Sequence, residues 1–277
     1  MYNSSGMVWW QGVVQDVNDP EQIGRVRVRI FGYHISDIQK LPIENLPWAS
    51  PIMPISSASI GGLGQSPTGV VVGSWVVGFF RDGENAQDPI IFGTIPGLPQ
   101  ESADKTNGFS DPEGKYPGQF IPHGSDLRES DVNRLARGVT SDTIVESKKS
   151  SVDSTVGEPA TPYGAKYPDN NVISTKSGHH LEFDDTPGAE RIHIYHKSGT
   201  FIEIHPDGTT VKKTQSDDYE IINGDKNIHI TGNLNMVVDG KIEVSGGSSA
   251  EYKYAGKHDL TSGGNTTVKA PKIDLNP

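Results

Sequence analysis

Cysteine is absent from this chain of 277 residues. No disulfide and no thiolate-bound metal is therefore expected. Hydrophobic residues make up only 33% of the sequence, and no apolar run approaches the ~20 residues that a membrane-spanning helix needs. The N-terminal stretch "MYNSSGMVWW" lacks the basic and apolar segments of a signal peptide. These absences predict a soluble protein that is synthesised in the cytoplasm.

Sequence motifs of catalysis are missing as well. There is no G-x-S-x-G, and the glycine-rich stretch at 61–64 lacks the Lys-Ser/Thr pair of a phosphate-binding loop. The net charge of −11 leaves no broad basic surface for nucleic acid. We therefore predict no catalytic residues, no cofactor and no nucleic-acid partner.

Glycine and proline are abundant, with 32 and 19 residues, which favours short strands and turns over helices. Residues 1–97 have the pattern of four or five strands separated by turns, and one of these strands alternates strictly between two faces. Its two faces hold Val26, Val28 and Ile30 on one side and Arg25, Arg27 and Arg29 on the other. At this size a small antiparallel barrel of the OB-fold type is a common solution.

Two sets of side chains in this domain leave alternatives open. The three arginines are predicted to form a solvated strand face beside Asp16 and Asp19, with a nucleic-acid or glycan face as the alternative. The tryptophans are predicted to fill the barrel or a trimer interface, and stacking on glycan or single-stranded nucleic acid is their alternative role. These tryptophans are Trp9, Trp10, Trp48 and Trp75.

Residues 98–165 change character, because they are rich in Pro, Gly, Ser and Asp and almost lack periodicity. We predict an extended connector with one short helix that ends at Gly138. From residue 166 onward, short strands alternate with turns at Pro187-Gly188, Ser198-Gly199 and Asp207-Gly208. Residues 166–277 are therefore predicted to be all-β.

Within residues 222–270 glycine recurs at every eighth position, except at one such position, which holds serine. The corner glycines are Gly224, Gly232, Gly240, Gly256 and Gly264, and Ser248 stands at the fourth of the six positions. An apolar residue follows four positions after each of these six residues. These predicted spike-core residues are Ile228, Met236, Val244, Tyr252, Leu260 and Val268. An even period with few apolar residues indicates strands and corners, not a helix.

The eight-residue repeat is too short for one chain to enclose its own core. If three chains wind together, each supplies one wall per repeat and the inward side chains meet on the axis. Glycine would then mark the corner, where we expect a φ that a β-carbon resists. An array of β-hairpins on one chain is the alternative, but it would leave open strand edges. We predict an intertwined, three-stranded β-helix in a homotrimer.

Histidines give weak candidates for metal binding. His193 and His196 point to opposite faces of a strand, so they cannot chelate together, and the pair His179 and His180 is equally unspecific. One inward histidine per chain would give three ligands on a trimer axis. His258 is the best candidate because it shares strand parity with Leu260. Solvated or packed histidines are the plainer interpretation, and no metal site is predicted.

Several motifs resemble the central spike of contractile phage tails, the cell-puncturing baseplate protein of T-even-like phages, which is related to the VgrG spikes. The N-terminal ones are "GVVQDVNDPEQIGRVRVRIFGYH", "LPWASPIMPISSASIGGLG" and "FRDGENAQDPIIFGTIPG". The connector adds "GFSDPEGKYP" and "NRLARG". The remainder adds "SGHHLEFDDTPGAERIHIYHKSGTFIEIHPDG" and "APKIDLNP". Together they extend over nearly the whole chain.

The resemblance implies an OB-fold seated on a trimeric hub protein and a β-helical needle whose blunt end carries a PAAR-type tip protein. The tip-docking residues would be Ile273, Leu275 and Pro277, although simple fraying of the chain end is the alternative. The family prototype also has a lysozyme domain between barrel and needle. Here that interval holds fewer than 70 residues, and its carboxylates lack apolar material to position them across a cleft.

The sequence therefore predicts an all-β, non-enzymatic homotrimer: an OB-fold domain (1–97), a connector (98–165) and a β-helical spike (166–277). Its expected place is the virion baseplate, after synthesis in the host cytoplasm. Its expected role is to puncture the host outer membrane by transient mechanical contact. A trimeric adhesin for surface glycan and a peptidoglycan-degrading tail lysozyme are the alternatives.

Overall fold

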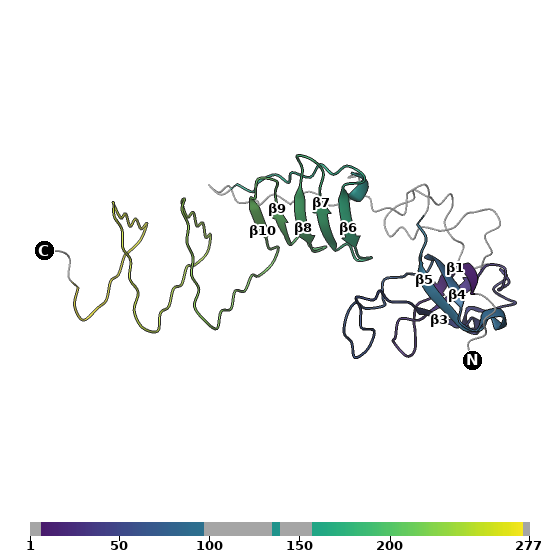
Figure 1. The fold of residues 1–277 in the computed structure, drawn as a ribbon. Helices are drawn as coiled ribbons and strands as arrows, with labels where there is room; N and C mark the ends of the chain where they lie inside the picture. The colour runs from purple at the N-terminus through teal and green to yellow at the C-terminus, as the bar shows by residue number, and fades with distance from the viewer. Residues whose placement is uncertain (1–6, 97–134, 139–156, 274–277) are drawn as a thin grey trace. The chain divides into compact units, whose positions relative to one another are not determined.

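The computed structural model describes residues 7–96, 135–138 and 157–273 (Figure 1). All of its regular structure is β-strand apart from three single-turn 3-10 helices. No helix in these residues is long and apolar enough to cross a membrane. The all-β class predicted from composition is confirmed.

Five strands close a barrel near the N-terminus: β1 (Val8–Asp16), β2 (Val26–Ile30), β3 (Trp48–Pro51), β4 (Trp75–Phe80) and β5 (Pro89–Thr94). The order around the barrel is β1-β2-β3-β5-β4, and β4 pairs with β1 to close it. Only the β3–β5 pair is parallel. Two 3-10 turns, η1 (Ile43–Asn45) and η2 (Gly83–Asn85), lie in the connections. The expected OB-fold barrel is confirmed.

The barrel core is built from the alternating apolar residues of these strands. Val14, Val28 and Val76 are fully or almost fully buried in it, and Trp10 lies against Phe80. A β-carbon at Gly78 would lie 2.5 Å from the Trp10 ring and 2.0 Å from the Ile90 carbonyl oxygen. Glycine at position 78 therefore makes room for the indole.

The four tryptophans do not share one role. Trp10 fills the barrel as expected, whereas Trp9 points outward and is 53% exposed. On the outer surface Trp9 contacts Phe79 and Phe92 edge-on, with ring centroids 5.7 and 6.0 Å apart. An aromatic patch thus lies on neighbouring strands β1, β4 and β5.

The arginine face of β2 corrects part of the sequence-based prediction. Arg25 pairs with Asp19 at 2.7 Å, and Arg27 lies 3.9 Å from Asp16, so the acidic neighbours are the expected ones. Arg29, however, is fully buried and not solvated. Its guanidinium donates to Gln15 Oε1, to the Ile35 carbonyl and to the Leu41 carbonyl. It holds the long β2–β3 connection against the barrel.

A second, five-stranded antiparallel sheet follows: β6 (Asn170–Ser174), β7 (His180–Asp184), β8 (Arg191–Tyr195), β9 (Phe201–Ile204) and β10 (Thr210–Lys213). The strands pair in chain order. Gly188, Gly199 and Gly208 have φ values of 82°, 90° and 83° in the connecting turns, as their turn motifs predicted. The third 3-10 turn, η3 (Leu135–Arg137), ends at Gly138, whose φ is 70°.

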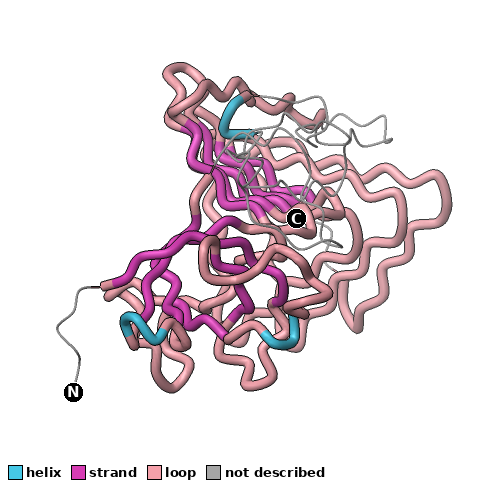
Figure 2. Tube along the Cα trace, turned by 90° about the vertical axis from the view of Figure 1, so that its right-hand side faces the viewer, coloured by secondary structure: helices cyan, strands magenta, loops and turns pink. Residues whose placement is uncertain are grey.

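Residues beyond β10 form no strand pairs within the described part of the chain (Figure 2). They bend at 223–224, 231–232, 239–240, 247–248, 255–256 and 263–264. Each of these bends contains one of the regularly spaced glycines of the eight-residue repeat, or Ser248 in their place. Every residue from 215 to 273 is exposed.

Replacing Arg29 with methionine tests its role in the barrel. Arg29→Met leaves three partly buried acceptors without the Arg29 donors, so we expect a loss of about 3 kcal/mol in the free energy of unfolding. Arg81→Met, which removes the exposed Arg81–Asp88 pair, should cost under about 0.5 kcal/mol. All four tryptophans lie in the barrel, so urea unfolding followed by tryptophan fluorescence reports on this domain. Equal losses for the two variants would contradict the proposed role.

Candidate functional site: a sheet with a covered polar face and an open apolar face

The second sheet has reversed polarity. Along β7 and β8, every second residue belongs to one face, and that face carries Glu182, Asp184, Arg191 and His193, all buried. The intervening residues Leu181, Phe183, Ile192 and Ile194 belong to the other face. The covered face is thus mainly polar, with Tyr195 and Phe201 also buried on it, and the apolar face has no cover from the described part of its own chain.

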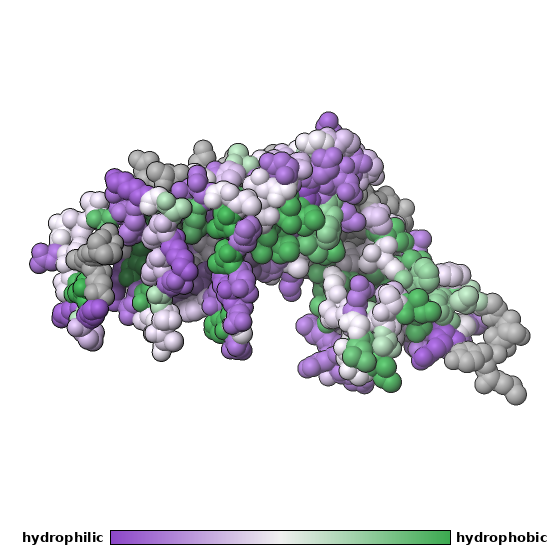
Figure 3. All heavy atoms as spheres, turned by 60° about the vertical axis from the view of Figure 1, so that its left-hand side comes forward, coloured by the Kyte–Doolittle hydropathy of each residue, from purple (hydrophilic) through white to green (hydrophobic). Residues whose placement is uncertain are grey.

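The open face is a continuous apolar surface. Its large side chains lie on paired positions of four neighbouring strands and are 36% to 62% exposed. They are Ile173, Phe183, Ile192, Ile194, Ile202 and Ile204. Apolar side chains are visible at the surface in the space-filling view (Figure 3). A patch of this extent marks an interaction surface.

A strap, residues 157–169, covers the polar face. It contacts the strands in turn: Glu158 pairs with Lys213 of β10 at 2.7 Å, and Thr161 donates to Glu203 of β9 at 2.7 Å. Tyr163 lies over Arg191 of β8, with the guanidinium carbon 4.8 Å from the ring centroid. The Lys166 amide donates to Thr186 at the end of β7. The strap therefore crosses the strands from β10 to β6.

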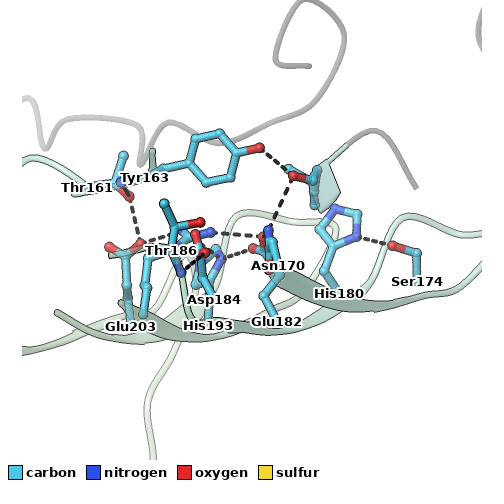
Figure 4. Close-up of polar contacts among 12 residues, drawn as sticks. Thr161, Tyr163, Asn170, Ser174, His180, Glu182, Asp184, Thr186, His193 and Glu203 are labelled. Atoms are coloured by element: carbon cyan, nitrogen blue, oxygen red, sulfur yellow. Dashed lines mark hydrogen bonds and ion pairs between the residues drawn. The ribbon is translucent and has the colours of Figure 1, made fainter. Parts of the chain in front are cut away.

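Arg191 is the centre of the polar layer between strap and sheet. Its guanidinium lies 2.9 Å from Glu182 Oε1 and 2.7 Å from Glu203 Oε1, and all three side chains are buried. His193 Nδ1 lies 3.0 Å from Glu182 Oε2. Figure 4 shows the side chains of Glu182, His193 and Glu203 on the side of the sheet that faces Thr161 and Tyr163 of the strap. Two carboxylates held by one arginine tie β7, β8 and β9 together under the strap.

Residues of η3 extend this layer at β6. Tyr163 Oη donates to the Leu135 carbonyl at 2.8 Å, and Asn170 Nδ2 donates to the same oxygen at 3.2 Å. Asn170 also donates to Glu182 at 3.1 Å. A β-carbon at Gly138 would lie 2.5 Å from the Ala165 carbonyl oxygen, so the glycine there allows close approach to the strap.

Burial and pairing shift the pKa values of this layer in opposite directions. Burial alone raises the pKa of Glu182, but the His193 hydrogen bond and the Arg191 charge outweigh it and hold that pKa below its usual value. Glu203 behaves alike: burial raises its pKa, but the hydrogen bonds from Thr161 and Arg191 outweigh burial and leave that pKa below its usual value. Burial, with the nearby Glu182 charge, raises the pKa of Tyr163 to about 12.

The histidines at the sheet's turns form no evident metal site. The His179 and His196 rings lie 4.5 Å apart, but their Nδ1 atoms accept from the amides of Lys197 and Ser198. That arrangement puts the proton on Nε2, which a metal would need free. Among residues 7–96, 135–138 and 157–273, no three His, Asp or Glu side chains form a metal-binding group.

The repeat has two distinct sides in the structure. Odd-numbered charges pair within a segment, as Lys241 with Glu243 and Lys257 with Asp259. Across the bend at 255–256, even-numbered Tyr254 and His258 stack with centroids 4.4 Å apart. Side chains that meet across a bend lie on its inner side. The even-numbered Glu220 and Lys226 also pair across the bend at 223–224, so this side carries one charge pair beside its apolar residues. Since eight is an even number, the even positions stay on the inner side from one segment to the next.

The predicted spike-core residues belong to this inner side but are open in the single chain. Ile228, Met236, Val244, Tyr252, Leu260 and Val268 are between 67% and 79% exposed. His258 shares their parity and stacks on Tyr254 beside a bend, away from mid-segment. Of the predicted tip-docking residues, Ile273 is about half exposed, and Leu275 and Pro277 lie outside the described residues.

The reason expected for the corner glycines is wrong. None of Gly224, Gly232, Gly240, Gly256 and Gly264 has a φ in the left-handed region, and a β-carbon added to any of them would meet no atom of its own chain within 4 Å. Backbone strain therefore does not explain them. The described residues of the single chain therefore give no steric reason for glycine at these bends.

Sequence reasoning missed the polar layer under the strap. The signal was present, because "HLEFD", "RIHIY" and "FIEI" each place a charge on alternate positions between apolar residues. Which of the two alternating faces is covered depends on residues 157–169, which the sequence analysis assigned to the connector and the start of the spike. The carboxylates of the connector, which the sequence predicts to be non-catalytic, lie between residues 101 and 131, outside the described ranges.

Acid should open the polar layer. A carboxylate with a depressed folded pKa stabilises the fold above its unfolded pKa of about 4.3, and that stabilisation is lost as pH falls through the lower folded value. We expect peptides from 157–213 to lose protection against a brief hydrogen-exchange pulse, given at one fixed pH, after incubation below about pH 4. The double variant Glu182→Gln with Glu203→Gln should lose this acid-dependent step. Unchanged protection at low pH would contradict the prediction.

Comparison with known proteins identifies the family. The profile of the Gp5 N-terminal OB domain matches residues 33–177, just over half of the chain. Protein Gp5 of Vibrio phage KVP40 is 39% identical over 275 residues, which cover 85% of this chain and 64% of that protein. The pre-baseplate central spike protein Gp5 of Enterobacteria phage T4 is 44% identical over 119 residues.

The T4 match covers 41% of this chain and 20% of the T4 protein, so the chain spans less than two thirds of either relative. The profile match alone includes more than half of the chain, and the closed barrel that precedes and overlaps it has the strand arrangement that the name implies. The resemblance in the sequence motifs is confirmed. The chain belongs to the Gp5 family, the central spike proteins of T4-like phage baseplates.

Proposed function

We propose that three copies of this chain form a needle that punctures the host outer envelope mechanically when the tail sheath contracts. Membership of the Gp5 family makes the chain a component of the virion's tail baseplate. The observation that carries the trimer is the open apolar face of the second sheet. Its charged face is already closed by the strap, so only the apolar side remains for a partner.

Three identical sheets facing a common axis satisfy this surface. Each large apolar side chain that leaves water contributes about 1.5–3 kcal/mol, and the face presents six of them. Cyclic symmetry gives every copy the same environment and leaves none of the apolar faces uncovered. A single sheet with this face in water would be prone to aggregate.

The repeat requires the same arrangement. Its inner side is mainly apolar and uncovered, and the described residues 215–273 have no paired strands of their own. Two further chains supply both the missing strands and the missing core. The bend glycines, which nothing in their own chain explains, would then lie where neighbouring chains approach closely.

The mechanical role follows from such an assembly. Chains that are wound around each other must unwind together before the needle fails, so its unfolding is slow. The strap, which contacts β10, β9 and β8 and leads directly into β6, anchors the end of the connector to the needle. In this proposal a trimeric hub protein holds the barrel end, and a PAAR-type tip protein docks at Ile273, Leu275 and Pro277.

We propose that no covalent chemistry is involved. The T4 relative bears the name of a pre-baseplate central spike protein, and the buried carboxylates at Glu182 and Glu203 are neutralised by Arg191. A glycosidase instead needs an acid with a raised pKa beside an ionised partner. Both Glu182 and Glu203 have lowered pKa values.

One observation favours a second function, that of a trimeric adhesin. The aromatic patch of Trp9, Phe79 and Phe92 is open on the barrel's outer surface, and aromatic rings of this kind stack on sugar rings as well as on proteins. Binding of surface glycan that is lost in Trp9→Ala would support the adhesin. If the barrel binds a hub protein and binds no glycan, the result would support the spike.

The mass in solution tests the trimer. Light scattering should give about three times 29.9 kDa, and the trimer should survive SDS without boiling. Ile194→Asp should abolish it, because a charge would enter the covered face. Ile55→Asp is the matched control, since Ile55 is fully exposed on the barrel. A monomeric wild type, or an SDS-resistant Ile194→Asp trimer, would contradict the proposal.

A muralytic assay tests the absence of enzyme activity. The purified trimer should release no more soluble fragments from peptidoglycan than buffer does, while a lysozyme added to the same preparation cleaves it. Release that depends on the spike would mean that residues between 98 and 165 form a catalytic site, and the mechanical proposal would then be incomplete.

A further inference from the structure

Neighbouring segments in the proposed needle belong to different chains. Each chain bends after every eight residues and so supplies one segment to each of three faces in turn. By the threefold symmetry of the proposed trimer, the segment beside it on any face comes from another copy and is displaced by eight residues. A residue i therefore lies beside i−8 and i+8 of its neighbours, about 4.8 Å away.

The inner-side residues of the first repeats form columns of similar size. With a spacing of eight, Ile230 is followed by Val238, and Leu234 is followed by Ile242. Such columns accept a displacement of one repeat at almost no cost, because one aliphatic side chain replaces another of about the same volume. Register is weakly specified wherever successive repeats look alike.

Later repeats alternate strongly in size. Tyr254 stands between Gly246 and Ser262 in its column, and His258 stands between Ala250 and Thr266. Tyr254 and His258 stack on each other on the inner side of the bend, so they form one large unit. Each large side chain thus has small residues one repeat before and one repeat after it.

Gly246 is not explained by its own chain. It lies before the bend at 247–248, its φ is not in the left-handed region, and a β-carbon there would meet nothing within 4 Å. A glycine inside an extended segment weakens it unless another group approaches closely. Position 246 is an inner-side position, so the approaching group comes from the core of the needle.

We propose that Tyr254 of one chain packs against Gly246 of a neighbouring copy, and that this contact fixes the register of the three chains. The contact rests on the proposed trimer. A displacement of one repeat would place Tyr254 beside Tyr254 and Gly246 beside Gly246. The first pair overpacks the core and the second leaves a void, and both are costly.

The absence of cysteine makes displacement directly measurable. Thr261 is an outer-side position, so Thr261→Cys does not disturb the core. In the correct register, residue 261 lies beside Lys253 and Lys269 of its neighbours. After a displacement of one repeat, two copies of residue 261 lie side by side, within the Cα separation of a disulfide. An oxidised, boiled sample then shows a disulfide-linked dimer on a non-reducing gel.

Three variants on the Thr261→Cys background separate packing from register. Gly246→Val removes the space for Tyr254, and the trimer should dissociate in SDS about tenfold faster or more. Gly246→Val with Tyr254→Val makes the column uniform. It should regain SDS resistance but yield more of the disulfide-linked dimer than the parent does, because the Tyr254–Gly246 contact no longer opposes a displacement. Ser245→Val is the matched control on the outer side, and it should behave like the parent with no dimer.

The outcomes distinguish this contact from the trimer itself. A monomeric parent overturns the proposed function and the contact with it. A trimeric parent whose Gly246→Val variant keeps full SDS resistance overturns the contact alone. The absence of disulfide-linked dimer from the double variant overturns the register role. Should Gly246→Val fail to assemble, recovery of the trimer in the double variant supports the contact, and failure to recover overturns it.

Discussion

The structure depends on one interaction, the burial of Arg191 between Glu182 and Glu203 beneath the strap. A buried charge with a missing partner is costly, so this layer is stable only when the strap and all three central strands are in place. Because of this layer, the sheet buries its polar face against the strap of its own chain. The apolar face stays open in the single chain, and the proposed trimer would cover it.

The eight-residue repeat also separates a polar side from an apolar side, but it does so without a covering segment. The sheet separates its faces by strand alternation and covers one of them with a strap. The repeat separates them by parity, which an eight-residue period preserves through every bend. Charges pair with charges on the outer side, and apolar side chains gather on the inner side. The proposed needle is thus apolar on its axis and polar outside along both parts, although the two parts use different backbone arrangements.

The barrel differs because it completes its own core. Its strands close on themselves, its buried arginine is satisfied by carbonyls of its own chain, and Trp10 is held by the space at Gly78. The large apolar side chains that it leaves exposed include the aromatic patch around Trp9 and residues of the β3–β4 connection, among them Ile55, Ile60 and Leu63. In the proposed spike, such exposed groups on a self-sufficient domain would contact another protein, whereas the later residues would contact copies of themselves.

The sequence by itself determined the period of the repeat, the places of the turns at Gly188, Gly199 and Gly208, and the barrel strands, because glycine spacing and alternation are local signals. It did not determine that Arg29 is buried or that Glu182 and Glu203 share Arg191. A strand pattern gives two faces but not which face is covered. That choice was made by the strap and by the β2–β3 connection, segments without a pattern of their own, whose positions only the tertiary structure decided.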